Sequence, residues 1–287
     1  MRMFGSGAAV RVLGAGDNVV DRYVDAGVMY PGGNAVNVAV YARRCGAEAA
    51  YRGVVGTDAA GDVVLAALRD EGVDVSGVQR ADGPNAYAEV AIVDNDRVFK
   101  DSNDGVSEFD LTEADYARLS GFDVVHTAYS GSLIRSVPRM AAYTRVSFDF
   151  SNRLTESYVD WMLPSLYLAT FSGTGLDDEQ TEALLSRGLE HGARHVLVTR
   201  GSAGAWLATA DGVHRQPTVA SRVVDTMGAG DAFIAGLLVG LVGGRDLTSS
   251  LARAANCAAL ACSVAGAFGH PAAVAATMLP HLPGEPT

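Results

Sequence analysis

The stretch DTMGAGDAFIAGLLVGL, residues 225–241, holds a turn of small residues between two carboxylates, followed by a long apolar run. The apolar run is typical of a buried helix. A glycine-rich turn that leads into a helix leaves backbone N–H groups without partners, and the helix dipole adds partial positive charge there. The stretch therefore predicts a turn that can hold an anion such as a phosphate group.

The residues of this turn suggest separate roles. We expect Gly228, Ala229 and Gly230 to line the anion site, because small residues let an anion approach the main chain closely. Asp231 would follow in the first helical turn, where a carboxylate can take a proton from an attacking hydroxyl group. An ordinary capped helix is the alternative, since Asp also favours first turns for stability. Asp225 could hold a cation or brace the turn.

Composition limits the remaining function classes. The chain has 287 residues and is 48% hydrophobic, which suits a large α/β domain with a sizeable core. The formal net charge of −11 argues against a nucleic-acid partner or an anionic-membrane partner. Lys100 is the only lysine, so a P-loop lysine and a protein-kinase strand lysine are excluded. No run resembles a signal peptide or a membrane span, and we expect a soluble, cytoplasmic protein.

Cysteine and histidine usage gives no metal signature. Cys45, Cys257 and Cys262 form no C-x-x-C motif, so we expect buried apolar residues without a disulfide framework. The six histidines are scattered and H-E-x-x-H is absent. His126 follows a predicted strand and could line a pocket, but we interpret it as a core or supporting residue. The missing G-x-S-x-G elbow argues against a serine hydrolase.

Alternating strands and helices predict a mostly parallel sheet that is covered on both faces. We expect strands at 10–13, 49–55, 123–126, 146–149, 166–171 and 195–199. One helix is expected from residue 35 to about residue 46, and a second follows the turn GTDAAG and ends at residue 71. Further helices are expected at 112–119, 135–143, 156–163, 177–191, 247–264 and 271–279. Hairpins are expected at 86–100, with a turn near 94–96, and between RGSAGAWLA and GVHRQP. The chain is expected to form a single domain, 1–287, with lid strands drawn from about 14–34 and 84–107.

Polar residues near the N-terminus suggest a site for a hydroxylated ligand. Asp17 and Asp21 follow a strand, at the end where α/β proteins place ligand sites, and carboxylates suit a polyol. Turn chemistry is the alternative for both residues. Gly14 and Gly16 begin a dinucleotide fingerprint, but its third glycine is missing, which argues against a nicotinamide-dependent oxidoreductase.

A second glycine turn precedes the helix that begins near Ala35. Gly32 and Gly33 expose backbone N–H groups, Asn34 could cap the helix, and Asn37 would lie one turn further on. Amides at a helix start suit a neutral hydroxylated ligand. Capping alone would explain Asn34 but not both glycines.

Three motifs in this order resemble the ribokinase-like (PfkB) family of sugar and nucleoside kinases. They are PGGNAVNVAVYARRCGAEAAYRGVVGTDAAGD at 31–62, VLVTRGSAGAWLA at 196–208, and DTMGAGDAFIAGLLVGL, with Met227 where the family usually has threonine. The resemblance covers nearly the whole chain. It implies an α/β three-layer sandwich with a mostly parallel central sheet and a small β lid.

The resemblance also implies a kinase that transfers phosphate from Mg-ATP to a primary hydroxyl group. Asp231 matches the catalytic base, and Gly228, Ala229 and Gly230 match the anion hole. The positions that match sugar-binding residues are Asp17, Asp21, Gly32, Gly33, Asn34 and Asn37. Those on the nucleotide side are Thr199, Gly201, Gly204 and Asn256. The family also suggests a monovalent cation such as K⁺ near Asp225, and a homodimer through the lid is a further hypothesis because exposed strand edges invite pairing.

One departure concerns the metal. The family commonly carries N-x-x-E after the strand at 166–171, but this chain has ATFSGTGLDDEQ at 169–180. Asp177, Asp178 or Glu179 could substitute for the missing asparagine and glutamate.

Within the family, the N-terminal segment and the short segment DRVFKDSNDGV are most similar to fructoselysine 6-kinases. The substrate implied is a fructosamine, and Asp101, Asp104 or Glu89 could bind its ammonium group. Lys100 could contact substrate or lie on the solvated surface. A ribokinase or fructokinase that acts on a plain sugar is the alternative within the family. A non-catalytic sugar-binding protein of the same fold is the alternative of another class.

Overall fold

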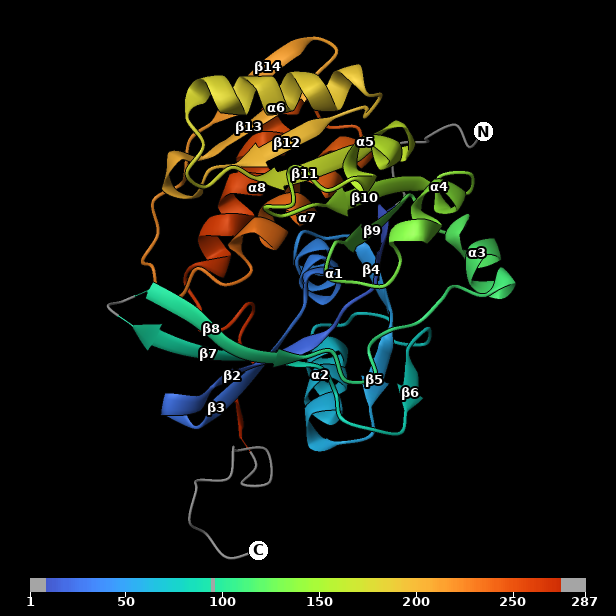
Figure 1. Ribbon diagram of the computed structural model, residues 1–287, viewed down its shortest axis with the longest axis vertical. Coiled ribbons are helices and arrows are strands. Elements are labelled where there is room, and N and C mark those ends of the chain that lie inside the picture. The colour runs from blue at the N-terminus through green and yellow to red at the C-terminus, as the bar shows by residue number, and fades with distance from the viewer. Residues whose placement is uncertain (1–8, 94–95, 275–287) are drawn as a thin grey trace, which may run out of the picture.

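The structure is a computed structural model that describes residues 9–93 and 96–274 (Figure 1). Its largest sheet is built from Arg11–Ala15 (β1), Glu48–Arg52 (β4), Val124–Ala128 (β9), Arg145–Asp149 (β10), Leu168–Ser172 (β11), Val196–Thr199 (β12), Ala205–Thr209 (β13) and Gly212–Gln216 (β14). Their order is β14-β13-β12-β11-β10-β9-β1-β4. Neighbours run parallel from β4 to β12, whereas β13 and β14 form the expected antiparallel hairpin.

Helices cover both faces of this sheet. One cluster of buried apolar side chains includes residues of Asn34–Arg44 (α1), Ala59–Asp70 (α2), Ala229–Val242 (α7) and Leu247–Ala261 (α8). The other includes residues of Glu113–Leu119 (α3), Val137–Met140 (α4), Tyr158–Met162 (α5) and Asp178–Glu190 (α6). The mostly parallel sheet between two helical layers confirms the predicted α/β architecture.

The strand sequences explain why both faces are covered. Val12 and Val124 lie in the first cluster, whereas their successors Leu13 and Val125 lie in the second. Successive side chains of a strand point to opposite faces, so a continuous apolar run requires a hydrophobic partner on each side.

A smaller sheet has strands Val19–Tyr23 (β2), Val28–Gly32 (β3), Tyr87–Val93 (β7), Asp96–Asn103 (β8) and Ala272–Ala273 (β15), in the order β15-β3-β2-β7-β8. In Figure 1, β2, β3, β7 and β8 lie on the far side of α1 from α6, next to α2. The β7–β8 pair is antiparallel, which confirms the predicted hairpin, and its register shifts between Glu89 and Val90. Residues 94 and 95 of the expected turn lie outside the described residues.

One strand expectation and two helix expectations need correction. The single strand expected at 49–55 is divided at Gly53 into β4 and Val54–Gly56 (β5), and β5 pairs with Gln79–Ala81 (β6) instead of the large sheet. A Cβ on Gly53 would lie 2.0 Å from the hydroxyl oxygen of Tyr51, so the main chain bends where only glycine fits. The helices expected at 135–143 and 156–163 are shorter, because 3-10 turns occupy 134–136 and 163–165.

The helix expected at 271–279 is wrong where the structure describes it. Ala272 and Ala273 form β15 and pair with Met29 and Val28 at the edge of β3. That edge offers backbone partners that a local helical pattern cannot reveal, and residues beyond 274 lie outside the described part of the chain.

Two local signals for helix ends are confirmed, whereas of the three cysteines, which were expected to be buried, only Cys257 is buried and the other two are half-buried. Thr112 caps α3 in a capping box with Asp115, and Gly46 follows α1 with a φ of +87°. The three cysteines are free, and the thiols of Cys45 and Cys257 are in contact between α1 and α8. Among residues 9–93 and 96–274, no helix combines the length and the hydropathy of a membrane span.

Candidate active site

The polar residues predicted near the two glycine turns meet at one edge of the large sheet. Asp17 follows β1 and Asp149 ends β10, at the carboxyl ends of parallel strands. The helices α1 and α7 pack together against this sheet, as Figure 1 shows, and they contribute Asn34, Asn37 and Asp231.

Asp231 is held by two amides of α1. The Nδ2 group of Asn34 donates to its Oδ1 at 2.8 Å, and the Nδ2 group of Asn37 donates to its Oδ2 at 2.7 Å. Burial raises the pKa of Asp231 to about 8; the bond from Asn37 opposes this shift, and the charges of Asp149 and Asp17 add to it. The carboxyl group is thus fixed in orientation and is a stronger base than an exposed aspartate.

Asn34 is not the helix cap that the sequence suggested. It is the first residue of α1, and Gly33 occupies the cap position without a side-chain bond. The carboxylate of Asp17 accepts hydrogen bonds from the backbone N–H groups of Asn34, at 2.9 Å, and Ala35, at 3.2 Å. Because Asp17 satisfies the start of α1 from a distance, the Asn34 side chain is released into the site.

The glycine pair before α1 has a packing reason. A Cβ on Gly32 would lie 2.8 Å from Oδ2 of Asp21, which is buried in β2. A Cβ on Gly33 would lie 2.7 Å from Cα of Asn18, and Gly33 has a φ of +106°. Both glycines therefore allow β2 and its carboxylate to approach the start of α1.

Asp149 was missed by the sequence reasoning. Its Oδ2 accepts from Nδ2 of Asn34 at 2.9 Å, and its Oδ1 accepts from the backbone N–H of Ser151 at 2.8 Å. Burial raises its pKa to about 6. The signal was present, because Asp149 ends a predicted strand in the same way that Asp17 follows one.

The turn before α7 leaves an open helix start. Gly228 is the N-cap with a φ of +71°, and a Cβ there would lie 2.9 Å from Cβ of Ala267. The Ala229 N–H points to the carbonyl of Thr226 at 3.3 Å, and the first helical bond runs from Ala232 to Gly228 at 2.9 Å. A Cβ on Gly230, which is exposed, would meet nothing within 4 Å. Space for a ligand thus remains beside the first turn.

Asp225 braces this turn. Its Oδ1 accepts from the N–H of Met227 at 2.9 Å, and its Oδ2 accepts from the N–H of Gly266 at 3.0 Å. The hydroxyl group of Tyr23 in β2 also donates to Oδ2, at 2.7 Å. One carboxylate therefore connects the turn to a neighbouring loop and to the smaller sheet.

The residues predicted for the nucleotide side lie at the end of β12 and on α8. Thr199 ends β12, Gly201 begins the 3-10 turn that follows, and a Cβ on Gly204 would lie 2.2 Å from the carbonyl oxygen of Gln216. Asn256 is exposed on α8, where its side chain donates to the Ala252 carbonyl at 2.8 Å. Among the described residues, no hydrogen bond joins these positions to Asp231.

The acidic residues suggested as substitutes for N-x-x-E have structural partners. Asp177 caps α6 through the N–H of Gln180 at 2.8 Å, and Asp178 forms a 2.8 Å ion pair with Arg200. Glu179 is exposed in the first turn of α6. In the part of the chain that the structure describes, no group of three or more His, Cys, Asp or Glu residues is arranged to hold a metal ion.

The candidates for ammonium binding lie on the smaller sheet and the loop after it. Glu89 is half-buried on β7, opposite Asp101 on β8, and Asp101 accepts from the Tyr87 hydroxyl at 3.0 Å. Asp104 and Lys100 are exposed.

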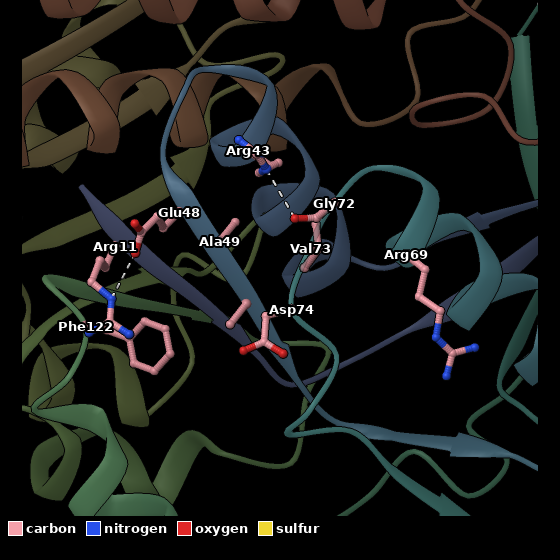
Figure 2. A pocket seen from close by; sticks show the side chains of 10 residues that line it. Arg11, Arg43, Glu48, Ala49, Arg69, Gly72, Val73, Asp74 and Phe122 are labelled. Atoms are coloured by element: carbon pink, nitrogen blue, oxygen red, sulfur yellow. Dashed lines mark hydrogen bonds and ion pairs between the residues drawn. The ribbon is translucent and has the colours of Figure 1, made fainter. Parts of the chain in front are cut away.

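A separate cavity of about 520 Å³ opens at the other end of the strands, beside the starts of β1 and β4 (Figure 2). Arg43 donates to the Gly72 carbonyl at 3.1 Å, and Arg11 pairs with Glu48 at 3.4 Å. None of the predicted site residues lines this cavity.

The sequence of this chain is similar to known proteins over most of its length. A family model described as "pfkB family carbohydrate kinase" matches residues 8–271. Fructosamine kinase FrlD of Bacillus subtilis is 40% identical over 266 residues, which cover 91% of this chain and 94% of that protein. Fructoselysine 6-kinase of Escherichia coli is 39% identical over 259 residues, covering 88% of this chain and 97% of that protein.

Solved structures share the fold at lower identity. Ribokinase of Arabidopsis thaliana in complex with ribose and ATP superposes with a TM-score of 0.76 at 21% identity, over 91% of this chain and 95% of that one. Fructokinase of Xylella fastidiosa with bound ATP gives a TM-score of 0.75 at 23% identity, over 90% of this chain and 94% of that one. These likenesses confirm the ribokinase-like fold.

Proposed function

Because the chain belongs to the pfkB family of carbohydrate kinases, we propose that it phosphorylates the 6-hydroxyl group of a fructosamine such as fructose-lysine. The enzyme is a phosphotransferase with an alcohol acceptor, and ATP is its co-substrate. The fructosamine substrate is supported by the names of two relatives at about 40% identity over most of both chains. A fructosamine carries its amine at carbon one, so carbon six bears its only primary hydroxyl group. We also propose that the enzyme works in the cytoplasm, where ATP is supplied.

The observation that carries the catalytic part of the proposal is the pair of amides on Asp231. Asn34 and Asn37 each donate to one carboxylate oxygen, so an incoming hydroxyl group meets the base in a single orientation. The raised pKa of Asp231, about 8, brings its basicity close to neutral pH, where a general base is most effective. We assign Asp231 as the group that takes the proton from the sugar hydroxyl as the phosphoryl group is transferred.

The open start of α7 supplies the anion hole in this proposal. Phosphoryl transfer depends on positioning and on stabilisation of the charge on the transferring group. Gly228, Ala229 and Gly230 present the main chain at the positive end of the helix dipole, and the free space beside Gly230 accommodates the group.

For the sugar side, we propose that Asp17, Asp21, Asn34 and Asn37 contact the substrate hydroxyl groups, with Gly32 and Gly33 allowing their approach. Asp149 adds a carboxylate that the sequence reasoning did not include. These carboxylates favour a substrate that carries an ammonium group, as a fructosamine does, over a neutral sugar. Thr199, Gly201, Gly204 and Asn256 are proposed to contact the nucleotide.

The residues of this chain support the two proposed metal ions, Mg²⁺ and K⁺, to different degrees. Mg²⁺ commonly binds through substrate phosphates and water with few protein ligands, so we propose that it arrives with ATP and needs no N-x-x-E motif. A monovalent cation such as K⁺ at Asp225 remains a proposal. Asp225 already accepts hydrogen bonds from Met227, Gly266 and Tyr23, and these bonds favour its bracing role.

A homodimer through the smaller sheet is a separate proposal. The strand β8 lies at one end of that sheet, and an edge strand can pair with a second copy. Sedimentation over a range of concentrations tests this, and a monomer throughout would contradict it.

A substrate panel tests the proposed reaction. The purified enzyme is supplied with Mg-ATP and with fructose-lysine, a second fructosamine, ribose or fructose, and ADP release is measured. We expect the highest kcat/KM with a fructosamine. A preference for ribose or fructose would assign a plain-sugar kinase, and binding without turnover of any sugar would assign a sugar-binding protein.

A further inference from the structure

His126 lies in β9 directly behind the site and is fully buried, with 0% of its surface exposed. Both of its ring nitrogens have polar partners. Its Nε2 atom lies 2.6 Å from Oδ1 of Asn34, and its Nδ1 atom lies 3.0 Å from Oγ of Ser147 in β10. A histidine that only filled space in the core would not need two aligned partners.

The bonds of Asn34 determine which histidine nitrogen carries the proton. The Nδ2 group of Asn34 has two hydrogens, and it donates them to Asp231 at 2.8 Å and to Asp149 at 2.9 Å. The other orientation of the amide would place its carbonyl oxygen 2.9 Å from Oδ2 of Asp149, which has a pKa of about 6 and is ionised near pH 7, so two acceptors would face each other. The Oδ1 atom therefore faces His126, and because it can only accept, Nε2 must be the donor.

The remaining nitrogen completes the chain of bonds. Burial lowers the pKa of His126 to about 3, so the ring is neutral near pH 7 and carries one N–H. With Nε2 as donor, Nδ1 accepts from the hydroxyl group of Ser147. A directed chain thus runs from Ser147 through His126 and Asn34 to the carboxylates of Asp231 and Asp149.

We propose that His126 is a positioning residue for phosphoryl transfer: its Nε2–H holds the Asn34 carboxamide so that both amide hydrogens face Asp231 and Asp149. This inference rests on the proposed role of Asp231 as base. His126 contacts neither substrate nor the reacting atoms, and it acts only through Asn34. Its neutral form is what the chain requires, because a charged ring would donate at both nitrogens and Ser147 would have to turn.

The groups around Asp231 show how loss of His126 would be detected. The charges that raise the pKa of Asp231 are those of Asp149 from β10, Asp17 after β1 and Asp21 from β2. A hydrogen bond to a carboxylate favours its charged form. If the Asn34 amide rotates away, Asp231 loses a donor amid negative charge, so its pKa rises and the acid limb of the kcat profile moves to higher pH.

Matched variants at position 126 test the proposal. In His126→Gln, a side-chain amide can still donate to Asn34, whereas His126→Leu fills space without a donor. We expect His126→Leu to lower kcat by about tenfold to a hundredfold, with KM for ATP changed less than about threefold, and to shift the acid limb upward. We expect His126→Gln to recover most of the rate. Wild-type kcat and pH profile in His126→Leu, or equal impairment in both variants, would overturn the proposal.

A second variant and a direct measurement keep the test decisive if His126→Leu does not fold. Ser147→Ala removes the far end of the chain, and we expect a smaller loss of kcat, about twofold to fivefold, in the same direction. Nitrogen NMR of the wild-type imidazole near neutral pH should show a protonated Nε2 and an unprotonated Nδ1. The opposite tautomer or an imidazolium ion would overturn the proposal. Because this readout needs no substrate, its failure is distinct from failure of the fructosamine assignment.

Discussion

Two glycine turns lead into helices in this molecule, and they use their glycines in opposite ways. Before α1, the N–H groups of Asn34 and Ala35 are taken by the carboxylate of Asp17, and both glycines are surrounded by protein atoms. Before α7, the first turn has open space at Gly230. One helix start is closed by an internal carboxylate, and the other, in our proposal, receives an external anion.

The two glycine turns have similar sequences, but this difference indicates different roles for them. The closed start of α1 cannot hold a phosphate group, but its rigidity positions the Asn34 and Asn37 amides on Asp231. The open start of α7 places the same Asp231 beside the proposed anion site. In the proposed mechanism, base and anion hole therefore share one helical turn, and the other helix holds the base in place.

Loss of the base should have the largest effect. Asp231→Asn removes the proton acceptor, and we expect kcat to fall by about two to four orders of magnitude. The overall fold and sugar binding should remain, as judged by circular dichroism and calorimetric titration. Near-normal turnover in this variant would remove Asp231 from the mechanism.

The open turn should tolerate a side chain structurally but not chemically. A Cβ on Gly230 would meet no protein atom within 4 Å, so we expect the melting temperature of Gly230→Val to change little. The side chain would occupy the proposed phosphoryl site, and we expect kcat to fall by about a hundredfold or more. An unchanged rate and ATP affinity would contradict the anion-hole assignment.

The closed turn should respond in the opposite manner. Gly33→Val combines a φ of +106° with a Cβ contact of 2.7 Å to Asn18, so the native backbone excludes it. We expect a loss of roughly 2–4 kcal/mol in the free energy of unfolding, measured by chemical denaturation. If Gly33→Val is as stable as Gly230→Val, the contrast between the two turns is wrong.

The pH dependence should follow Asp231. Its pKa of about 8 predicts that kcat/KM rises with pH and levels off above that value, since the base must be ionised. The folded pKa is raised above the unfolded value of 3.8, so the protonated form stabilises the fold. This stabilisation is complete below pH 3.8 and is lost as the pH rises toward 8.

Denaturation of the wild type and Asp231→Asn across this range checks the linkage. The variant should become more stable relative to the wild type as pH rises. A difference that is independent of pH would show that the pKa of Asp231 is not raised in the folded protein.

The smallest effect is expected at the brace of the open turn. Tyr23→Phe removes one donor to Asp225 and leaves those of Met227 and Gly266. We expect a loss of about 1 kcal/mol in stability and about a twofold to fivefold lower kcat. A loss as large as that of Gly230→Val would show that the smaller sheet controls the turn directly.

The contrast also explains which features the sequence could predict. The glycine turn before α7 and the alternation of strands and helices are local patterns, and both can be predicted from the sequence. The prediction that Asn34 caps the helix is wrong, because Asp17, which is distant in the sequence, accepts the hydrogen bond from the first backbone N–H group of the helix. Asp149 ends a predicted strand, which marks it as a candidate. Its contact with Asn34 and that of His126 form only where β9 and β10 meet α1, and the sequence pattern does not show which helix lies there.

The most direct test of the central claim is phosphorus NMR of the product formed from fructose-lysine and ATP. The account predicts a phosphate ester signal split into a triplet by the two protons of carbon six. The signal should be absent when Asp231→Asn replaces the wild type under the same conditions. A doublet, which indicates a secondary hydroxyl acceptor, or no ester with fructose-lysine while ribose or fructose is phosphorylated, would contradict it.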